Sequence, residues 1–368
     1  MKTGVLTSSR ADYGVYTPLL KALHADPFFD LEIIAFGTHL SEKYGSTLNE
    51  IEEGGFEVIH KVDTMPDGDN PEDISAAMGK TMINFSEFWK ANQYDLIFAL
   101  GDRYEMFAAV AAGLPFNIRV AHLHGGETTT GAIDNALRHS ITHMSHIHFA
   151  SAEVYKEKII SLTGKKDDIY NVGALSFDNL YNLPLLSMED FKNKFGVDMH
   201  FPTILITFHP ETIEFDKNEV YIDELVSALE ELKKFQLLIT MPNADTTGNM
   251  IRKKLNSFIE RNDNAAGFEN LGTVGYLSAI KHCVLMLGNT SSGCTEASFF
   301  PKWVINLGDR QHGRIVTPNM INCRIDKSEI IKKVNEVYGK VLPQRINIFG
   351  NGNTANSIIS VLRENYGG

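Results

Sequence analysis

Short apolar segments alternate with longer helical patterns along the first half of the chain. Each segment is bounded by Gly, Asp or Ser, and the strands that they predict are Lys2–Thr7, Leu31–Phe36, Phe56–Val62, Leu96–Leu100, Arg119–Leu123 and Ile147–Ala150. Strands that alternate with helices form a parallel sheet covered by helices. The alternation therefore predicts an α/β fold.

A second series of strands follows an irregular stretch near residues 171–202. The elements that it predicts are strands at Thr203–Thr207, Leu237–Met241, Val284–Leu287 and Val304–Leu307, and helices at Glu219–Lys234 and Thr247–Arg261. Because 368 residues exceed what one hydrophobic core usually serves, we expect two Rossmann-like domains, 1–175 and 176–352. Residues 353–368 form a helix that we expect to pack back on the first domain. Ligands of such sheets bind outside the carboxyl ends of the strands, which predicts a cleft between the domains.

Composition limits the kinds of binding partner and the cellular location that we expect. The net charge of −12 argues against a nucleic-acid-binding surface, which needs a basic footprint. No segment approaches the run of about 18 apolar residues that a membrane span needs, and the first residues lead into a strand pattern rather than a signal peptide. The cysteines Cys283, Cys294 and Cys323 form no Cys-x-x-Cys pair, so we expect them to be buried. We expect a cytoplasmic protein with no membrane or nucleic-acid partner.

Two polar loops follow strands of the first half. Ser9-Arg10-Ala11-Asp12-Tyr13 follows the first strand, where the guanidinium of Arg10 and the amides after it could receive a phosphate. The loop lacks the glycine spacing of a dinucleotide-binding loop and the Gly-Lys-Ser/Thr of a P-loop, which argues against bound NAD and against ATP hydrolysis. Asp102 and Arg103 follow the strand Leu96–Leu100, so we expect this pair at the ligand edge of the sheet.

The segment after the next strand is the richest in groups for acid–base chemistry. His124-Gly125-Gly126-Glu127 places an imidazole and a carboxylate beside two glycines, which let the backbone approach a ligand closely. Asp134 and Arg138 are four residues apart in a helical pattern and so share one helix face. The His-x-His-x-x-Glu spacing on a loop is not diagnostic of a metal site, and we expect no metal.

Polar groups also follow the strands of the second half. Three candidates stand just after predicted strands: His209, Asn243 and Arg310. Thr290, Ser291 and Ser292 lie at a predicted helix start, where small residues with free amides can hold a diphosphate. Glu296, farther along, could accept hydrogen bonds from ribose hydroxyls. Arg310 could reach the same anion with its guanidinium.

Together these stretches resemble the hydrolysing UDP-N-acetylglucosamine 2-epimerases of sialic-acid-type pathways, over nearly the whole chain. The motifs that carry the resemblance are Ser9-Arg10-Ala11-Asp12-Tyr13, Gly101-Asp102-Arg103, His124-Gly125-Gly126-Glu127, Gly131-Ala132-Ile133-Asp134, His209-Pro210, Gly288-Asn289-Thr290-Ser291-Ser292 and Asn306-Leu307-Gly308-Asp309-Arg310. The resemblance implies a glycosyltransferase-B-like architecture, with the nucleotide mainly on the second domain and the sugar facing the first. It also implies that UDP leaves by elimination across C1 and C2, that water adds to the resulting 2-acetamidoglucal, and that UDP and N-acetylmannosamine are released.

The resemblance implies roles for individual residues. The catalytic candidates are Asp102, Glu127, Asp134, His209 and His124. The candidates for binding UDP are Arg10, Arg103, Asn243, Thr290, Ser291, Ser292, Glu296 and Arg310. Proton removal from C2, which has no adjacent carbonyl, needs a positioned base while cations and amides stabilise the leaving UDP. Several family members carry a Glu where this chain has His124, which leaves open whether His124 or Glu127 fills that acid–base role.

Other substrates and activities fit the same motifs. UDP-2,4-diacetamido-2,4,6-trideoxyglucose would undergo the same chemistry, and no motif separates a 4-hydroxyl from a 4-acetamido group. A non-hydrolysing 2-epimerase would keep UDP on its product, but the Gly-Gly-Glu and Ile-Asp-Asn motifs favour the hydrolysing branch. A glycosyltransferase of the same fold would need an acceptor groove, of which we see no sign. We expect no cofactor, and the resemblance implies a homodimer or homotetramer.

Overall fold

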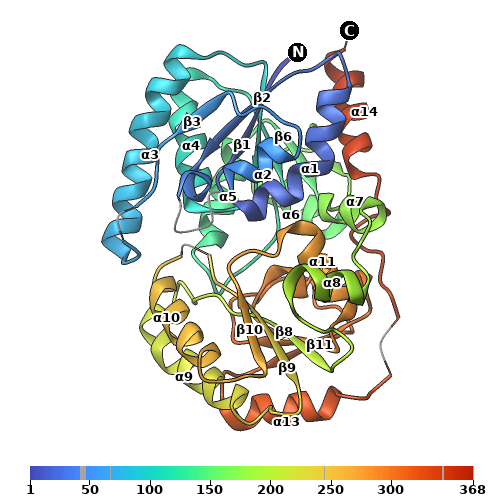
Figure 1. Ribbon diagram of the computed structural model, residues 1–368. Coiled ribbons are helices and arrows are strands. Elements are labelled where there is room, and N and C mark those ends of the chain that lie inside the picture. Colours follow the sequence, from blue (N-terminus) through green and yellow to red (C-terminus); the bar gives the residue numbers. More distant parts are fainter. Residues whose placement is uncertain (42–46, 67, 244, 342–343, 368) are drawn as a thin grey trace. The chain divides into compact units, whose positions relative to one another are not determined.

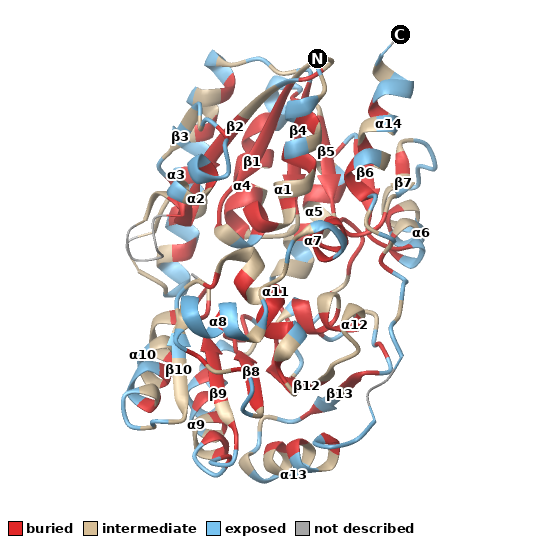
Figure 2. Cartoon of the chain, turned by 45° about the vertical axis from the view of Figure 1, so that its right-hand side comes forward, coloured by how far each residue is buried: buried red, intermediate tan, exposed pale blue. Residues whose placement is uncertain are grey.

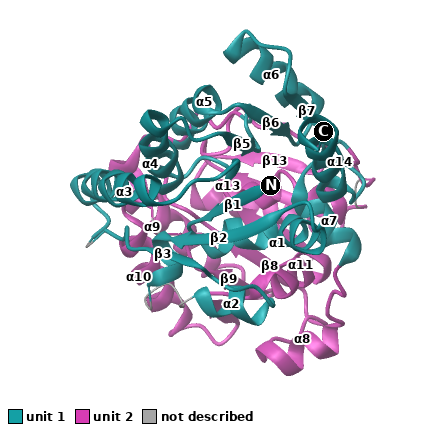
Figure 3. Cartoon of the chain, turned by 90° about the horizontal axis from the view of Figure 1, so that it is seen from above, with its two compact units in different colours: residues 1–127, 134–182, 348–368 teal, residues 128–133, 183–347 magenta. Residues whose placement is uncertain are grey.

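The computed structural model describes residues 1–41, 47–66, 68–243, 245–341 and 344–367. The chain forms two compact units (Figure 3). Unit 1 comprises Met1–Glu127, Asp134–Asn182 and Ile348–Gly368, and unit 2 comprises Thr128–Ile133 and Leu183–Asn347. Each unit has a parallel sheet of its own with helices around it, which confirms the α/β class.

Unit 1 is built on a seven-stranded sheet in the order β3-β2-β1-β4-β5-β6-β7 (Figure 1). Its strands are β1 Lys2–Thr7, β2 Asp30–Phe36, β3 His60–Val62, β4 Leu96–Leu100, β5 Val120–Leu123, β6 Ile147–Ala150 and β7 Ile169–Asn171. All neighbouring pairs run parallel. The edge strand β7 escaped the sequence analysis because it is three residues long and its pattern, Ile-Tyr-Asn, is too short to show a period.

Helices cover both faces of this sheet. They are α1 Arg10–Ala25, α2 Leu48–Glu53, α3 Pro71–Ala91, α4 Tyr104–Gly113, α5 Asp134–Met144, α6 Glu153–Thr163, α7 Leu175–Asn182 and α14 Thr354–Tyr366, with 3-10 turns η1 Gly37–Leu40 and η3 Leu114–Phe116. Alternate strand residues point to opposite faces, so Val5 packs with α1 and α14 while Leu6 packs with α3 and α4. The central strands β4, β5 and β6 are buried between these layers (Figure 2).

The last helix, α14, belongs to unit 1. The carboxylate of Asp178 on α7 accepts the amides of Thr354 and Ala355 at 2.8 and 2.7 Å, which satisfies two donors at the N-terminus of α14. Ile358 and Leu362 are fully buried in the core of the unit. Because α7 packs on α1 and α14, residues 176–182 belong to unit 1, and the boundary at residue 175 was placed seven residues too early.

Unit 2 is built on a six-stranded parallel sheet in the order β10-β9-β8-β11-β12-β13. Its strands are β8 Thr203–Thr207, β9 Gln236–Thr240, β10 Ala265–Phe268, β11 Leu285–Gly288, β12 Trp303–Leu307 and β13 Met320–Cys323. Its helices are α8 Met188–Phe195, α9 Asn218–Leu229, α10 Gly248–Ile259, α11 Gly272–His282, α12 Glu296–Phe299 and α13 Lys327–Val337, with 3-10 turns η4 Phe215–Lys217 and η5 Ser291–Gly293. The two edge strands, β10 and β13, were not predicted, because each has one neighbour and needs no continuous apolar run.

A short segment of the first half, Thr128–Ile133, clusters with unit 2 and not with the first domain as predicted. The amide of Thr130 donates to the carbonyl of His312 at 2.9 Å, and the amide of Ile133 donates to the Thr212 hydroxyl at 3.0 Å. A Cβ on Gly131 would collide with the carbonyl oxygen of Asp309, so only glycine fits there. Within the described residues, no helix is long and apolar enough to cross a membrane.

Candidate functional site

In both sheets the order of strands reverses beside the first strand of the unit. In unit 1 the reversal lies between β1 and β4, and in unit 2 it lies between β8 and β11. The loops after the strands on either side of such a point diverge, and the carboxyl ends of the strands there form the usual ligand site of an open α/β sheet. The predicted site residues follow these strands and their immediate neighbours.

Asp102 and Arg138 form the central ion pair of the unit 1 site. Asp102 follows β4, and the guanidinium Nη2 of Arg138, on α5, is paired with its carboxylate. Arg138 is 1% exposed, and its Nη1 donates to the backbone carbonyl of Glu127 at 2.8 Å. Arg138 therefore contacts two catalytic candidates, the side chain of Asp102 and the backbone of Glu127.

Glu127 is the most enclosed of the predicted carboxylates in unit 1. It follows β5 and is 4% exposed, and its Oε1 accepts a hydrogen bond from the Ser151 hydroxyl at 2.7 Å. Nδ1 of His124 lies 2.9 Å from the same oxygen. His124 has a φ of 61°, a left-handed conformation that few non-glycine residues adopt and that occurs often at functional sites. The structure thus brings His124 and Glu127 together as one hydrogen-bonded pair.

Asp134 is the first residue of α5 and is half-buried. A carboxylate in the first turn of a helix interacts favourably with the helix dipole. Asp134 stands one turn before Arg138 on the same helix, as the spacing predicted.

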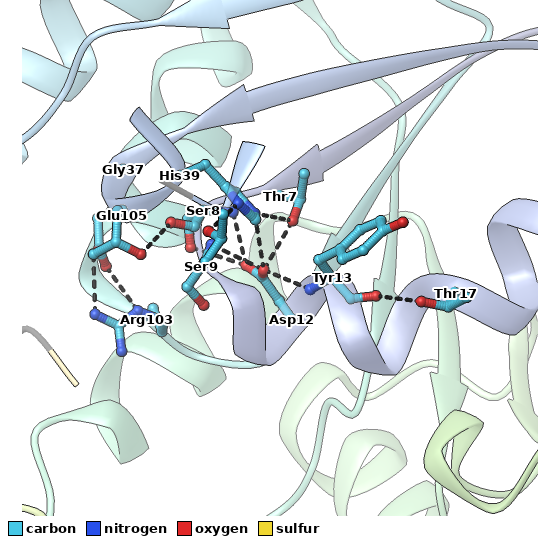
Figure 4. Close-up of polar contacts among 12 residues, drawn as sticks. Thr7, Ser8, Ser9, Asp12, Tyr13, Thr17, Gly37, His39, Arg103 and Glu105 are labelled. Atoms are coloured by element: carbon cyan, nitrogen blue, oxygen red, sulfur yellow. Dashed lines mark hydrogen bonds and ion pairs between the residues drawn. The ribbon is translucent and has the colours of Figure 1, made fainter. Parts of the chain in front are cut away.

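The loop after β1 is organised by Asp12 (Figure 4). Its carboxylate accepts the amides of Ser8, Ser9 and Tyr13 at 2.8 to 2.9 Å and the hydroxyl of Thr7 at 2.8 Å. Despite the burial that opposes it, these hydrogen bonds, together with the ring of His39, lower the pKa of Asp12. Three amides of this loop therefore already donate to Asp12, and Arg10 lies at the start of α1.

Arg103, just after β4, is held by Glu105 (Figure 4). Its Nε and Nη2 donate to the two carboxylate oxygens of Glu105 at 3.2 and 3.0 Å, and Glu105 is fully buried. This two-point contact sets the plane of the guanidinium.

In unit 2, His209 is fixed by an asparagine that the sequence analysis did not single out. Asn289, which follows β11 and is fully buried, accepts from the amide of His209 at 2.7 Å and donates to its carbonyl at 2.8 Å. The amide of Asn243, after β9, donates to Nδ1 of His209 at 3.4 Å. Loops after three adjacent strands therefore meet at His209, which is itself 8% exposed.

The hydroxyl-rich loop after β11 differs from the helix N-terminus predicted for it. Thr290 is followed by the 3-10 turn Ser291–Gly293, and α12 is four residues long, so the loop lacks the dipole of a regular helix. Ser292 is engaged by the Tyr276 hydroxyl at 2.6 Å and lies 3.1 Å from the Thr290 hydroxyl. Ser291 is exposed, and Glu296 begins α12 and is half-buried.

Arg310 follows β12 and is oriented from two sides. Its Nη1 donates to the carbonyl of Pro210 at 3.3 Å, and its Nη2 lies 3.5 Å from the carboxylate of Asp245. The backbone before it is held by Glu211, whose Oε1 accepts the amide of Asp309 at 2.9 Å. Burial raises the pKa of Glu211.

Three histidines of unit 1, His122 and His148, which are buried, and His139, which is half-buried, favour the neutral form. Burial lowers the pKa of His122 to about 3 and the pKa values of His139 and His148 to about 4. Within the part of the chain that the structure describes, no group of three His, Cys, Asp or Glu side chains is arranged to hold a metal ion. The three cysteines are buried and free.

Sequence reasoning did not assign an orienting role to the residues that orient the site. They are Asp12, Arg138, Ser151, Glu211, Tyr276 and Asn289. Asp12, Arg138 and Asn289 lay inside or beside recognised motifs, so motif membership was an available signal for them. Ser151, Glu211 and Tyr276 act through contacts with residues distant in sequence, which no local pattern reveals.

Comparison with known sequences identifies relatives along most of the chain. The family model described as UDP-N-acetylglucosamine 2-epimerase matches residues 21–363. The GDP/UDP-N,N'-diacetylbacillosamine 2-epimerase (hydrolyzing) of Campylobacter jejuni is 35% identical over 326 residues, which are 88% of this chain and 85% of that protein. Polysialic acid biosynthesis protein P7 of Escherichia coli is 34% identical over 336 residues, 90% of this chain and 84% of that protein. The UDP-N,N'-diacetylbacillosamine 2-epimerase (hydrolyzing) of Legionella pneumophila is 31% identical over 358 residues, which are 97% of this chain and 94% of that protein.

Solved structures show the same fold. The UDP-GlcNAc 2-epimerase of Methanocaldococcus jannaschii, solved in complex with UDP-GlcNAc and UDP, matches with a TM-score of 0.82 at 20% identity and covers 99% of this chain and 100% of that one. The solved structures show the fold, and the sequence relatives support the family assignment, since two of them are 35% and 34% identical over 88% and 90% of this chain. The chain belongs to the UDP-N-acetylglucosamine 2-epimerase family.

Proposed function

We propose that the chain is a hydrolysing 2-epimerase, which converts a UDP-linked 2-acetamido sugar and water to UDP and the free 2-epimeric sugar. The observation that carries this proposal is the joined group of Asp102, Arg138, Glu127 and His124 at the carboxyl ends of β4 and β5. Two carboxylates and an imidazole supply the proton-transfer groups that elimination and readdition require, and the buried guanidinium of Arg138 contacts the Asp102 carboxylate and the Glu127 backbone carbonyl. Two relatives above 30% identity carry "hydrolyzing" in their names.

The proposed reaction has two steps. In the first, a base removes the proton from C2 as the C1–O bond breaks and UDP departs with the bonding electrons, which leaves a 2-acetamidoglucal. In the second, an acid returns a proton to C2 on the opposite face, and water, deprotonated by a base, adds to C1. We assign the proton transfers to Asp102, Glu127, Asp134 and His124, and we place His209 at the sugar or the leaving phosphate.

We propose that UDP is held by side chains more than by a helix N-terminus. The groups that we assign to this role are Arg10, Arg103, Asn243, Thr290, Ser291, Ser292, Glu296 and Arg310. Arg103 and Arg310 are held in fixed orientations by Glu105 and by Asp245 with Pro210. Preoriented cations stabilise charge on a leaving diphosphate without reorganisation during the reaction.

Two substrates fit the proposal. UDP-N-acetylglucosamine is the first candidate, supported by the description of the family model. UDP-N,N'-diacetylbacillosamine, a 2,4-diacetamido-2,4,6-trideoxy sugar, is the second, favoured by the names of the Campylobacter and Legionella relatives. The name of the Escherichia coli relative supports a place in the synthesis of sialic-acid-type sugars. Both substrates present the same C1 and C2, so the same residues serve either.

The test is an NMR time course in D₂O with each UDP sugar in turn. A hydrolysing 2-epimerase releases free UDP and a reducing sugar that carries deuterium at C2, because C2 is reprotonated from solvent. An Asp102→Asn variant is the matched control and is expected to lose turnover. A product that retains UDP would overturn the hydrolytic assignment, and UDP release that needs an added acceptor would identify a glycosyltransferase.

A further inference from the structure

One histidine beside the proposed catalytic group has both ring nitrogens engaged inside the protein. His122, on β5, is fully buried. Its Nε2 lies 2.8 Å from the carbonyl oxygen of Gly101, and its Nδ1 lies 3.2 Å from the hydroxyl of Thr142. The ring has no access to a ligand, and the reaction proposed above does not use it.

The hydrogen bonds determine which nitrogen carries the proton. A carbonyl oxygen can only accept, so Nε2 must donate to Gly101. Burial keeps the ring neutral, with a pKa of about 3, so Nδ1 is unprotonated and accepts from the Thr142 hydroxyl. That hydroxyl also lies 3.0 Å from the carbonyl of Arg138, and its single proton serves one acceptor at a time.

The two partners of His122 stand next to the two halves of the central ion pair. Gly101 directly precedes Asp102 and has a φ of 75°, so its conformation sets the direction in which the chain leaves β4. Thr142 lies one turn after Arg138 on α5, and its hydroxyl contacts the Arg138 carbonyl. The imidazole therefore bridges the loop that carries Asp102 and the helix that carries Arg138.

Gly125, which follows His124, packs closely against the His122 ring and the Thr142 hydroxyl. A Cβ added at Gly125 would lie 2.9 Å from Nδ1 of His122 and 3.1 Å from the Thr142 hydroxyl. The backbone that leads to Glu127 thus packs against the same ring. Three segments that carry catalytic candidates meet around one imidazole.

We infer that His122 is a positioning residue, which sets the separation of the Asp102 carboxylate and the Arg138 guanidinium by holding Gly101 and Thr142. The inference rests on the proposed function only for its kinetic consequence, since the bridge itself is a property of unit 1. A displacement of about 1 Å in a catalytic group can lower a rate by about 100-fold. The binding of UDP is expected to be insensitive, because Arg103, the UDP-binding candidate next to Asp102, is held by Glu105 on α4.

His148 offers a matched control. It is the register partner of His122 on the neighbouring strand β6 and is 2% exposed. Its Nδ1 has no hydrogen-bond partner among the described residues. Replacing either histidine by phenylalanine makes the same change of side chain in adjacent buried positions of one sheet.

The kinetic test compares four variants with the wild-type enzyme. For His122→Phe we expect a fall in kcat of about 100-fold, with KM and the Kd for UDP within about threefold of wild type. His122→Gln can place an amide donor near the position of Nε2 and should recover most of the activity, whereas His122→Asn reaches only the position of Nδ1 and should not. His148→Phe should keep kcat within about threefold. Equal losses in His122→Phe and His148→Phe, or no rescue by glutamine relative to asparagine, would overturn the inference.

A structural readout separates this inference from the proposed function. If the wild-type enzyme turns over neither UDP sugar, the proposed function fails, and crystal structures of the His122→Phe and His148→Phe variants still decide the positioning role. Separation of Asp102 from Arg138 in His122→Phe alone supports it, and an intact pair in both variants refutes it. In the wild-type protein, ¹⁵N NMR of the His122 ring should show the neutral, Nε2-protonated form between pH 6 and 8.

Discussion

Replacing Arg138 by methionine removes the guanidinium that joins Asp102 to Glu127 while it keeps an unbranched side chain of similar length. The arginine side chain is 2% exposed and that of Asp102 is 20% exposed, so the carboxylate keeps partial access to water. Breaking a buried ion pair costs about 3–5 kcal/mol, because the remaining charge is uncompensated. Partial hydration of Asp102 places the expected loss near the lower end, at about 3 kcal/mol.

The converse change should cost more. Asp102→Asn leaves the more deeply buried member of the pair, Arg138, without its counter-charge, and we expect a loss of about 4 kcal/mol. In the double variant neither charge is left without its partner. Its loss in the free energy of unfolding should therefore be about 2 kcal/mol smaller than the sum of the two single losses, a coupling typical of residues in direct contact. The double-mutant cycle therefore isolates the pair from the effects of each substitution.

The two tryptophans of the chain make the assay specific for unit 1. Trp89, on α3, is buried in unit 1, whereas Trp303 lies on β12 in unit 2. In a Trp303→Phe background, tryptophan fluorescence during urea unfolding reports only unit 1. At an m value of about 1–3 kcal/mol/M, a loss of about 3 kcal/mol lowers the midpoint by about 1–3 M.

A surface arginine provides the control. Arg363 on α14 makes a two-point contact with Asp26 at 2.8 and 2.6 Å, in the same unit but exposed to solvent. Exposed ion pairs contribute little to stability, so Arg363→Met should leave the midpoint nearly unchanged. Equal shifts for Arg138→Met and Arg363→Met, or strict additivity in the Asp102 and Arg138 cycle, would refute the reasoning.

Three further predictions concern acid–base chemistry, UDP binding and pH. Glu127→Gln should lower kcat by about 100-fold or more, as expected for a lost proton-transfer group, whereas Ser151→Ala, which removes one hydrogen bond to Glu127, should lower it by about tenfold or less. Arg310→Met should weaken UDP binding by about 10- to 100-fold in calorimetry, the contribution of a charged hydrogen bond, while Arg324→Met, at an exposed arginine paired with Glu329, should leave it unchanged. Because burial raises the pKa of Glu211 above 4.5, the folded protein favours its protonated form, and this contribution to stability is lost as the pH rises above 4.5. Glu211→Gln should therefore raise the urea midpoint for unfolding of unit 2 at pH 7 but not at pH 4, measured by Trp303 fluorescence in a Trp89→Phe background. An equal shift of the midpoint at both pH values would contradict burial as the cause of the raised pKa.

The buried strands were predictable because most of their side chains are apolar on both faces. Lys2–Thr7, Leu96–Leu100, Ile147–Ala150 and Thr203–Thr207 have the bounds read from the sequence. Edge strands such as β13 need fewer apolar residues, and a local pattern could not separate them from loops. The segment Thr128–Ile133 was assigned to the wrong unit because its backbone partners, Thr212 and His312, lie far along the chain.

The sequence by itself determined the α/β class, the two sheets and the polar residues that follow their strands, because apolar periodicity and motif order are local properties. It also showed the resemblance to the epimerase family that the comparisons confirmed. Only the tertiary structure decided which of those polar residues act on one another. Arg138 reaches Asp102 and Glu127, and His122 bridges Gly101 and Thr142, because parallel strands bring the loops after β4 and β5 to one edge of the sheet beside α5. Spacing along the chain does not encode that proximity, since it depends on the order in which the strands pair.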